Sequence, residues 1–247
     1  TMSEKNIMFV IASLFAFSIL LFPNLAEADI LIKKNKLTES TVMGQIQPAK
    51  VEEGKTWIAK NKMREDIAES SIIVRLDLNK IYTIDHSKKT YSEIHLPVEI
   101  DKVFPPEAKQ MMEVMRIKSS SIKKTAETQI IRGWLCQKFL VEVEISMMEM
   151  NLPMKMEIWT STGLGIDLDA YKKLSGAILS LNPFTKNLAE EFEKIEGYPV
   201  LTISSMNMMG TETKEQEEVV SVEKRDVPAK TFNLPKGYEK IPYNPFE

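Results

Sequence analysis

The sequence contains few of the residues that supply acid–base or nucleophilic chemistry. Its 247 residues include two histidines and one cysteine. Histidine is the side chain that most often changes charge near neutral pH, so general acid–base catalysis has few candidates here. His86 lies in the run Asp85-His86-Ser87, which we interpret as a solvated turn. We expect a protein that is not an enzyme. A catalytic pair of carboxylates stays open as an alternative, because the distance between two such groups depends on the fold and not on their spacing in the sequence.

The motifs of common cofactor and metal sites are also missing. The sequence has no G-x-S-x-G elbow, no H-E-x-x-H and no C-x-x-C pair. Gly163-Leu164-Gly165 lacks the third glycine of a dinucleotide-binding loop. We therefore expect no cofactor and no metal site.

The single cysteine excludes a disulfide within the chain. Cys136 has no second cysteine to pair with. We expect it to be a small buried residue of the core, with pairing between two chains as the alternative. The expectation is a monomer that is stabilised by burial alone.

Charge of one sign is not in excess. The 32 lysines and arginines face 35 aspartates and glutamates, which gives a net charge of -3. Proteins that bind nucleic acid present a basic surface that neutralises phosphates. No nucleic-acid partner is expected.

Long apolar runs are missing except near the start of the sequence, at residues 7–22. Lys5 precedes this run, and Ala26-Glu27-Ala28 follows it with the small-x-small pattern that signal peptidase recognises. We expect residues 1–28 to be a signal peptide cleaved near Ala28, and residues 29–247 to be a single β-rich domain in the periplasm. An uncleaved membrane anchor is the alternative, because the run approaches the length that spans a bilayer.

Alternating apolar and polar residues predict antiparallel strands along most of the remaining chain. The period of two is clearest at Ile72–Leu78, where one face is expected to be buried, and at Phe139–Ile145. Turns are expected at Asn79 and Gly210. Further strands are predicted at residues 30–42, 55–59, 81–84, 90–96, 119–131, 154–159, 198–209 and 211–224, followed by an extended tail that would close against the sheet.

Three stretches have helical spacing. A helix is predicted from Pro105 to Arg116, with its methionines on the face that covers the sheet. Asp167 is expected to cap a second helix over residues 168–181. A third helix is predicted over residues 185–195, ending at Gly197.

Methionine is concentrated in a few places. Eleven of the fifteen methionines fall in four clusters, at residues 111–115, 147–150, 154–156 and 206–209. Methionine is flexible and polarisable, and it lines surfaces that adapt to varied apolar partners. Three interpretations stay open: the lining of an apolar ligand site, an ordinary core, or a thioether site for copper, which no histidine accompanies.

Three segments resemble a known family: Gly133–Phe139, Glu157–Thr160 and Phe232–Tyr238. Together they resemble exported bacterial proteins of unknown function that are similar to the periplasmic lipoprotein carriers and their outer-membrane receptors (LolA/LolB-like). The resemblance implies an α+β, mostly β fold: a strongly curved antiparallel sheet, a half-barrel closed by helices, around an apolar cavity for an acyl chain or another lipid-like ligand. It assigns no catalytic or ligand-binding residue.

The leading hypothesis is a soluble periplasmic protein that binds an apolar small molecule, lipid or acyl chain in that cavity, without chemistry. The alternative is a protein that interacts with another envelope protein and has a filled core and no small-molecule ligand. The residues expected to line the cavity are apolar residues of the strands and of the covering helix: Ile72, Val74, Leu76, Met111, Met112, Met115, Phe139, Val141, Val143, Ile145, Met154, Met156 and Ile158.

Overall fold

The computed structural model describes residues 29–106, 109–110, 115–147, 150–181, 188–208 and 210–244. The expected signal peptide, residues 1–28, lies outside these ranges. The described strands form one 13-stranded sheet. Their bounds are β1 Ile30–Val42, β2 Gln45–Ile46, β3 Lys50–Ala59, β4 Lys62–Ile67, β5 Ser70–Arg75, β6 Lys80–Asp85, β7 Thr90–His95, β8 Met115–Ile131, β9 Trp134–Met147, β10 Met150–Ser161, β11 Tyr198–Met208, β12 Thr211–Lys224 and β13 Glu239–Lys240.

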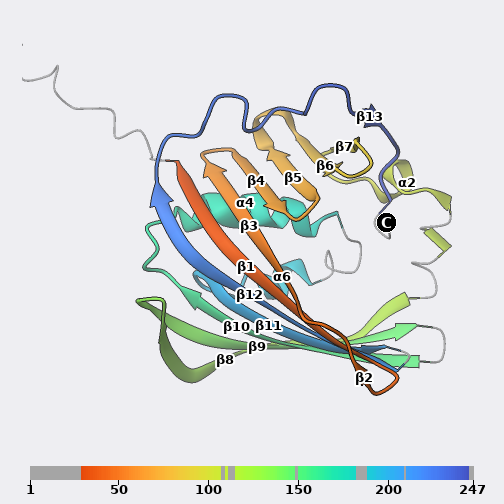
Figure 1. Ribbon diagram of the computed structural model, residues 1–247, viewed down its shortest axis with the longest axis vertical. Coiled ribbons are helices and arrows are strands. Elements are labelled where there is room, and N and C mark those ends of the chain that lie inside the picture. The colour runs from red at the N-terminus through yellow and green to blue at the C-terminus, as the bar shows by residue number, and fades with distance from the viewer. Residues whose placement is uncertain are drawn as a thin grey trace, which may run out of the picture.

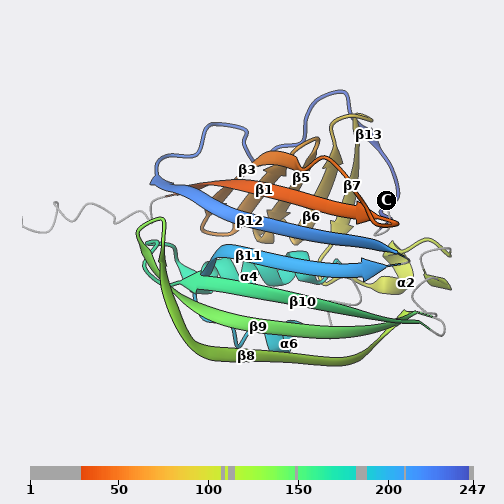
Figure 2. The same cartoon turned by 60° about the horizontal axis from the view of Figure 1, so that its bottom comes forward.

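The first strand, β1, lies in the middle of the sheet between two meanders. On one side follow β3, β4, β5, β6 and β7, and on the other follow β12, β11, β10, β9 and β8. These pairs are antiparallel, and the two-residue β13 adds a parallel pair at the edge of β7. The sheet curves strongly and does not close on itself (Figures 1 and 2). The expectation of a mostly β protein with a large curved antiparallel sheet is confirmed.

The helices of the described residues are short compared with the sheet. They are α2 Ile100–Val103, α4 Leu168–Leu179, α6 Ala189–Phe192 and the 3₁₀ helix η1 Leu76–Leu78. Both α4 and α6 lie on the inner side of the curved sheet (Figure 2). Asp167 caps α4 as predicted, because its carboxylate accepts from the amides of Asp169, at 2.9 Å, and Ala170, at 3.0 Å.

Two apolar clusters fill the space between the sheet and these helices. In the larger cluster, Leu174 of α4 is fully buried together with Val74 of β5 and Val219 of β12. The smaller cluster joins residues of α6 and its flanks to β9 and β10: Phe139, Val141, Val143, Ile158, Leu188 and Ile195. Cys136 belongs to the larger cluster and is fully buried, which confirms the expectation of a buried cysteine.

The outer face of β5 and β6 is also covered, by the C-terminal tail. Ile73 is fully buried there with Tyr82 and Ile84, and Phe232 and Leu234 of the tail pack against them. The expectation that the strand beginning at Ile72 buries a single face is therefore wrong: Val74 faces the inner core and Ile73 faces the tail. The expectation that the tail closes against the sheet is confirmed.

Two predicted elements end earlier than expected. The strand that starts near Ile72 stops at Arg75, because Leu76 begins the 3₁₀ helix and Asn79 turns the chain with φ +51°. The helix predicted over residues 105–116 does not reach Met115, which is the first residue of β8. Met111 and Met112 lie outside the described residues. The sequence also left β4, a short charged strand, without a prediction.

His86 lies in a turn, as expected, but its ring is partly buried and hydrogen-bonded instead of solvated. Its Nε2 lies 2.7 Å from Ser71 Oγ, and its Nδ1 lies 2.9 Å from Tyr238 Oη of the tail. Because Ser71 donates its single proton to Asp66, His86 must donate to Ser71. When a histidine activates a serine nucleophile, the serine donates its proton to the histidine, which is the opposite of the direction found here. Ser71 is also only 1% exposed. The network holds the tail on the sheet.

Tyr238→Ala is expected to release the tail from the outer face of the sheet. The change removes the hydrogen bond to His86 and the packing against the cluster around Ile73, at a cost of about 2–3 kcal/mol of unfolding free energy. Limited proteolysis should show faster cleavage at residues 225–244. The control is Tyr238→Phe, which loses the hydrogen bond alone and should keep most of the protection. Equal protection in wild type and Tyr238→Ala would contradict the tail's role.

In the described ranges, no helix is long and apolar enough to cross a membrane.

Candidate functional site: a cavity between helix α4 and the sheet

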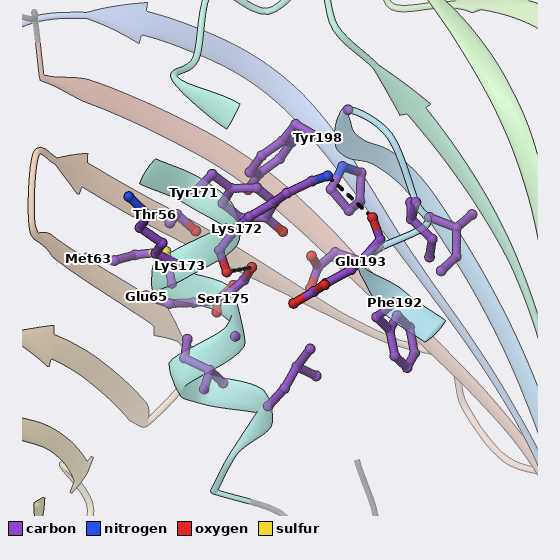
Figure 3. Close-up of a pocket in the computed structure, with 18 of the residues that line it drawn as sticks. Thr56, Met63, Glu65, Tyr171, Lys172, Lys173, Ser175, Phe192, Glu193 and Tyr198 are labelled. Atoms are coloured by element: carbon purple, nitrogen blue, oxygen red, sulfur yellow. Dashed lines mark hydrogen bonds between the residues drawn. The ribbon is translucent and has the colours of Figure 1, made fainter. Parts of the chain in front are cut away.

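A cavity of about 670 Å³ lies between α4, the segment around α6 and the inner face of the sheet. Its walls come from strands that are far apart in sequence, including β1, β3, β4, β10 and β12 (Figure 3). This volume is within the roughly 300–1,000 Å³ that is usual for small-molecule sites. The cavity is therefore large enough to hold a small organic ligand.

Much of the cavity wall is apolar. Ile158 of β10 contributes from the sheet, Ile178 and Leu179 contribute from α4, and Phe192 of α6 and Ile195 complete this side. Gly176 of α4 also lines the cavity, and a methyl group added to it would meet no atom within 4 Å. The helix thus leaves open space where most side chains would project.

A buried lysine faces this cavity from the centre of the sheet. Lys34 of β1 is 9% exposed, and its Nζ lies 2.7 Å from a carboxylate oxygen of Glu65 and 3.0 Å from one of Glu217. These partners come from β4 and β12, one on each side of β1. Alternation along β1 places Lys34 on the same face as Ile30 and Ile32, so the lysine occupies a core-facing position.

Two tyrosines complete the surroundings of the lysine. The Nζ of Lys34 lies 5.9 Å from the ring centroid of Tyr198, and the rings of Tyr198 and Tyr171 are 4.6 Å apart. Tyr198 is 2% exposed, whereas Tyr171 is half-buried. The ammonium group is thus enclosed by two carboxylates and an aromatic face.

This environment shifts the pKa values of the buried groups. Burial would lower the pKa of Lys34, but Tyr198, Glu65 and Glu217 together outweigh it and raise that pKa well above its ordinary value. Burial raises the pKa of Tyr198 and of Tyr171, and the positive charge of Lys34 only partly opposes this. Lys34 is therefore charged, and both phenols are protonated, at neutral pH.

One polar group in the cavity wall has no partner. Thr56 of β3 is 2% exposed, and its Oγ1 makes no hydrogen bond to any described residue. Thr56 lies directly opposite Glu65 in the pairing of β3 with β4, and both residues line the cavity. A buried hydroxyl without a partner is costly to stability.

The structure places most of the predicted lining residues elsewhere. Ile158 lines the cavity, and Val143 and Met154 border a separate hollow of about 260 Å³. The remaining described residues pack in the inner clusters: Ile72, Val74, Leu76, Phe139, Val141, Ile145 and Met156. Met115 begins β8 instead of lying on a covering helix, and Met111 and Met112 lie outside the described residues.

The polar residues of the cavity were missed by the sequence reasoning. A signal for Lys34 was present, because Ile30, Ile32 and Lys34 share one parity and a lysine interrupts that apolar face. Thr56, Glu65 and Glu217 had no such signal. They lie around Lys34 only because the sheet order places β4 and β12 on either side of the adjacent strands β3 and β1.

The described residues contain no group of three or more histidine, cysteine, aspartate or glutamate side chains placed to hold a metal ion. Burial raises the pKa of the Cys136 thiol, so little reactive thiolate forms at neutral pH.

Comparisons with known proteins identify a family and distant likenesses among solved structures. The model of a domain of unknown function, DUF4412, matches residues 42–238. A solved structure of PNGF-II is 12% identical with a TM-score of 0.37, over 87% of this chain. A LolA superfamily protein from Nitrosomonas europaea is 8% identical with a TM-score of 0.27, and the match covers 82% of this chain and 90% of that one.

The chain spans only about a third of the length of the PNGF-II chain, 32%. No curated protein matches the sequence. With TM-scores below 0.5, neither structure assigns a ligand or an activity to this chain.

Proposed function

Because the chain belongs to the DUF4412 family, a domain family of unknown function, we propose a function from the cavity itself. The protein is a binding protein that holds a ligand with an apolar portion between α4 and the sheet and performs no chemistry on it. The observation that carries this proposal is the cavity of about 670 Å³, with Ile158, Ile178 and Phe192 in its wall.

Export to the periplasm is part of the proposal. It is supported by the apolar run at residues 7–22 and the Ala26-Glu27-Ala28 pattern that follows it. A carrier that works outside the cytoplasm and uses neither cofactor nor metal fits a chain with one buried cysteine. The finer structural picture, a half-barrel closed by helices as in the lipoprotein carriers, belongs to the same proposal.

Gly176→Phe is expected to abolish ligand uptake without unfolding the protein. The new side chain would occupy the space into which Gly176 opens, where an added methyl group meets no atom within 4 Å. Titration with a hydrophobic fluorescent dye should show saturable binding to wild type and at least tenfold weaker binding to the variant.

The matched control is Gly176→Ala, which keeps the cavity almost unchanged. Because glycine is a poor helix former, alanine at this position in α4 should stabilise the protein by about 0.5–1 kcal/mol in thermal or urea unfolding. Dye binding by this control should equal that of wild type. A wild-type protein that binds no apolar probe would overturn the proposed function.

The second candidate function is interaction with another envelope protein. It is favoured by exposed apolar side chains around the turn from β1 to β2, where Met43 is 86% exposed and Ile46 is 87% exposed. This candidate needs no ligand in the cavity, so the dye titration with the Gly176 variants distinguishes the two.

A further inference from the structure

The buried polar end of the cavity is not electrically balanced. Lys34 supplies one positive charge there, and Glu65 and Glu217 supply two negative charges. The side chain of Lys34 is 10% exposed, compared with 24% for Glu65 and 34% for Glu217, so the lysine is enclosed and the carboxylates face the open space. A negative excess on partly buried groups attracts a positive charge.

The two carboxylates at this end keep free acceptor oxygens. Glu65 and Glu217 each contact Lys34 through one oxygen, Oε1, and their second oxygens have no partner among the described residues. The hydroxyl of Thr56 is buried beside Glu65 without a partner. A carboxylate can only accept, and Lys34 is already engaged by both carboxylates and by the face of Tyr198.

Two further lysines line the cavity, but they stand at its exposed rim. Lys172 and Lys173 are exposed residues of α4, and Lys172 donates to the carbonyl of Glu193 at 3.3 Å (Figure 3). Water screens charges at such positions, so these lysines only weakly offset the charge of the partly buried carboxylates. The apolar wall formed by Ile158, Ile178 and Phe192 lies beyond the polar end.

We infer that the ligand is an amphiphile with a protonated amine as its head group. The amine donates to the free oxygens of Glu65 and Glu217, and the apolar chain lies along the part of the cavity wall that includes Ile158. This inference rests on the proposed binding function and names the class of ligand. An anionic head group such as a carboxylate would meet two negative charges and is rejected.

Three probes with the same chain and different head groups test the inference: dodecylamine, dodecanol and dodecanoate. Each displaces a bound hydrophobic dye from the full-length protein near pH 7.5, below its micelle concentration. The amine is expected to bind at least tenfold more tightly than the alcohol, and dodecanoate is expected to bind most weakly. An amine that binds no better than the alcohol, or a dodecanoate that binds best, would overturn the inference while leaving the proposed function standing.

Glu217→Gln should reduce the preference for the amine to less than threefold and leave binding of the alcohol unchanged. The matched control is Glu215→Gln, two residues earlier on the same face of β12, where the carboxylate pairs with Lys36 at 2.9 Å and does not line the cavity. This control should keep the full preference. If none of the three probes displaces the dye, or no dye binds, the proposed function fails together with the inference.

Discussion

Lys34→Met is expected to lower the unfolding free energy by about 3 kcal/mol, the low end of the loss that follows when a buried ion pair is broken on one side. The change leaves the carboxylates of Glu65 and Glu217 facing each other without the ammonium between them. The estimate stays at the low end because both carboxylates keep some contact with solvent. Urea unfolding at pH 7 measures the difference.

Lys36→Met is the matched control for this prediction. Lys36 lies two residues further along β1 and pairs with Glu215, but both side chains are more exposed, at 28% and 41%. Such a pair contributes less than about 1 kcal/mol. Adding Glu65→Gln and Glu217→Gln to Lys34→Met should recover much of the stability, because the unpaired charges are then gone. A Lys34→Met protein as stable as Lys36→Met would show that the buried ammonium does not hold the centre of the sheet together.

Stability is expected to fall steeply above about pH 10, where the unfolded chain deprotonates its tyrosines and lysines. Lys34 and Tyr198 have raised pKa values in the folded protein, so their stabilisation is complete below that pH and is lost as the pH rises. Each group contributes a slope of about 1.4 kcal/mol per pH unit, so the pair gives about 2.8 kcal/mol per unit. The pKa of Tyr171 shifts in the same direction, but its side chain is only half-buried, which reduces its share.

Urea midpoints measured between pH 8 and pH 11.5 test this slope. The comparison variant is Tyr198→Phe, which removes one of the two titrating groups and should reduce the slope by about half. Tyr91→Phe is the control at another tyrosine of the sheet, which packs in the outer-face cluster away from Lys34. If Tyr198→Phe and wild type lose stability at the same rate, the buried lysine–tyrosine group is not the source of the alkaline sensitivity.

Local patterns in the sequence predicted the parts of the fold that depend on neighbouring residues. The hairpin of β11 and β12 turns at Gly210, which adopts φ +82°, and Asp167 caps α4, as expected from their sequence positions. Both features are settled within a few residues of chain, so single-sequence reasoning was sufficient for them.

The features that sequence reasoning missed depend on distant segments. Ile73 is buried because the tail returns to cover it, some 160 residues later in the chain near Phe232. The cavity gathers Lys34, Thr56 and Glu217 from three strands whose neighbourhood follows only from the sheet order. The alternation of side chains along one strand predicts which face of the sheet a residue occupies. It does not predict which other segment packs against that face.

The central position of β1 has a consequence for how the protein folds. β1 pairs with β12 along its whole length, joining Ile30 to Lys224 and Val42 to Thr211. The two meanders can form from local contacts, but the sheet becomes continuous only when the last long strand finds the first. Contacts between such distant segments slow folding, since the loop between them must be closed first. Until β1 and β12 pair, each of them is an edge strand of its own half of the sheet.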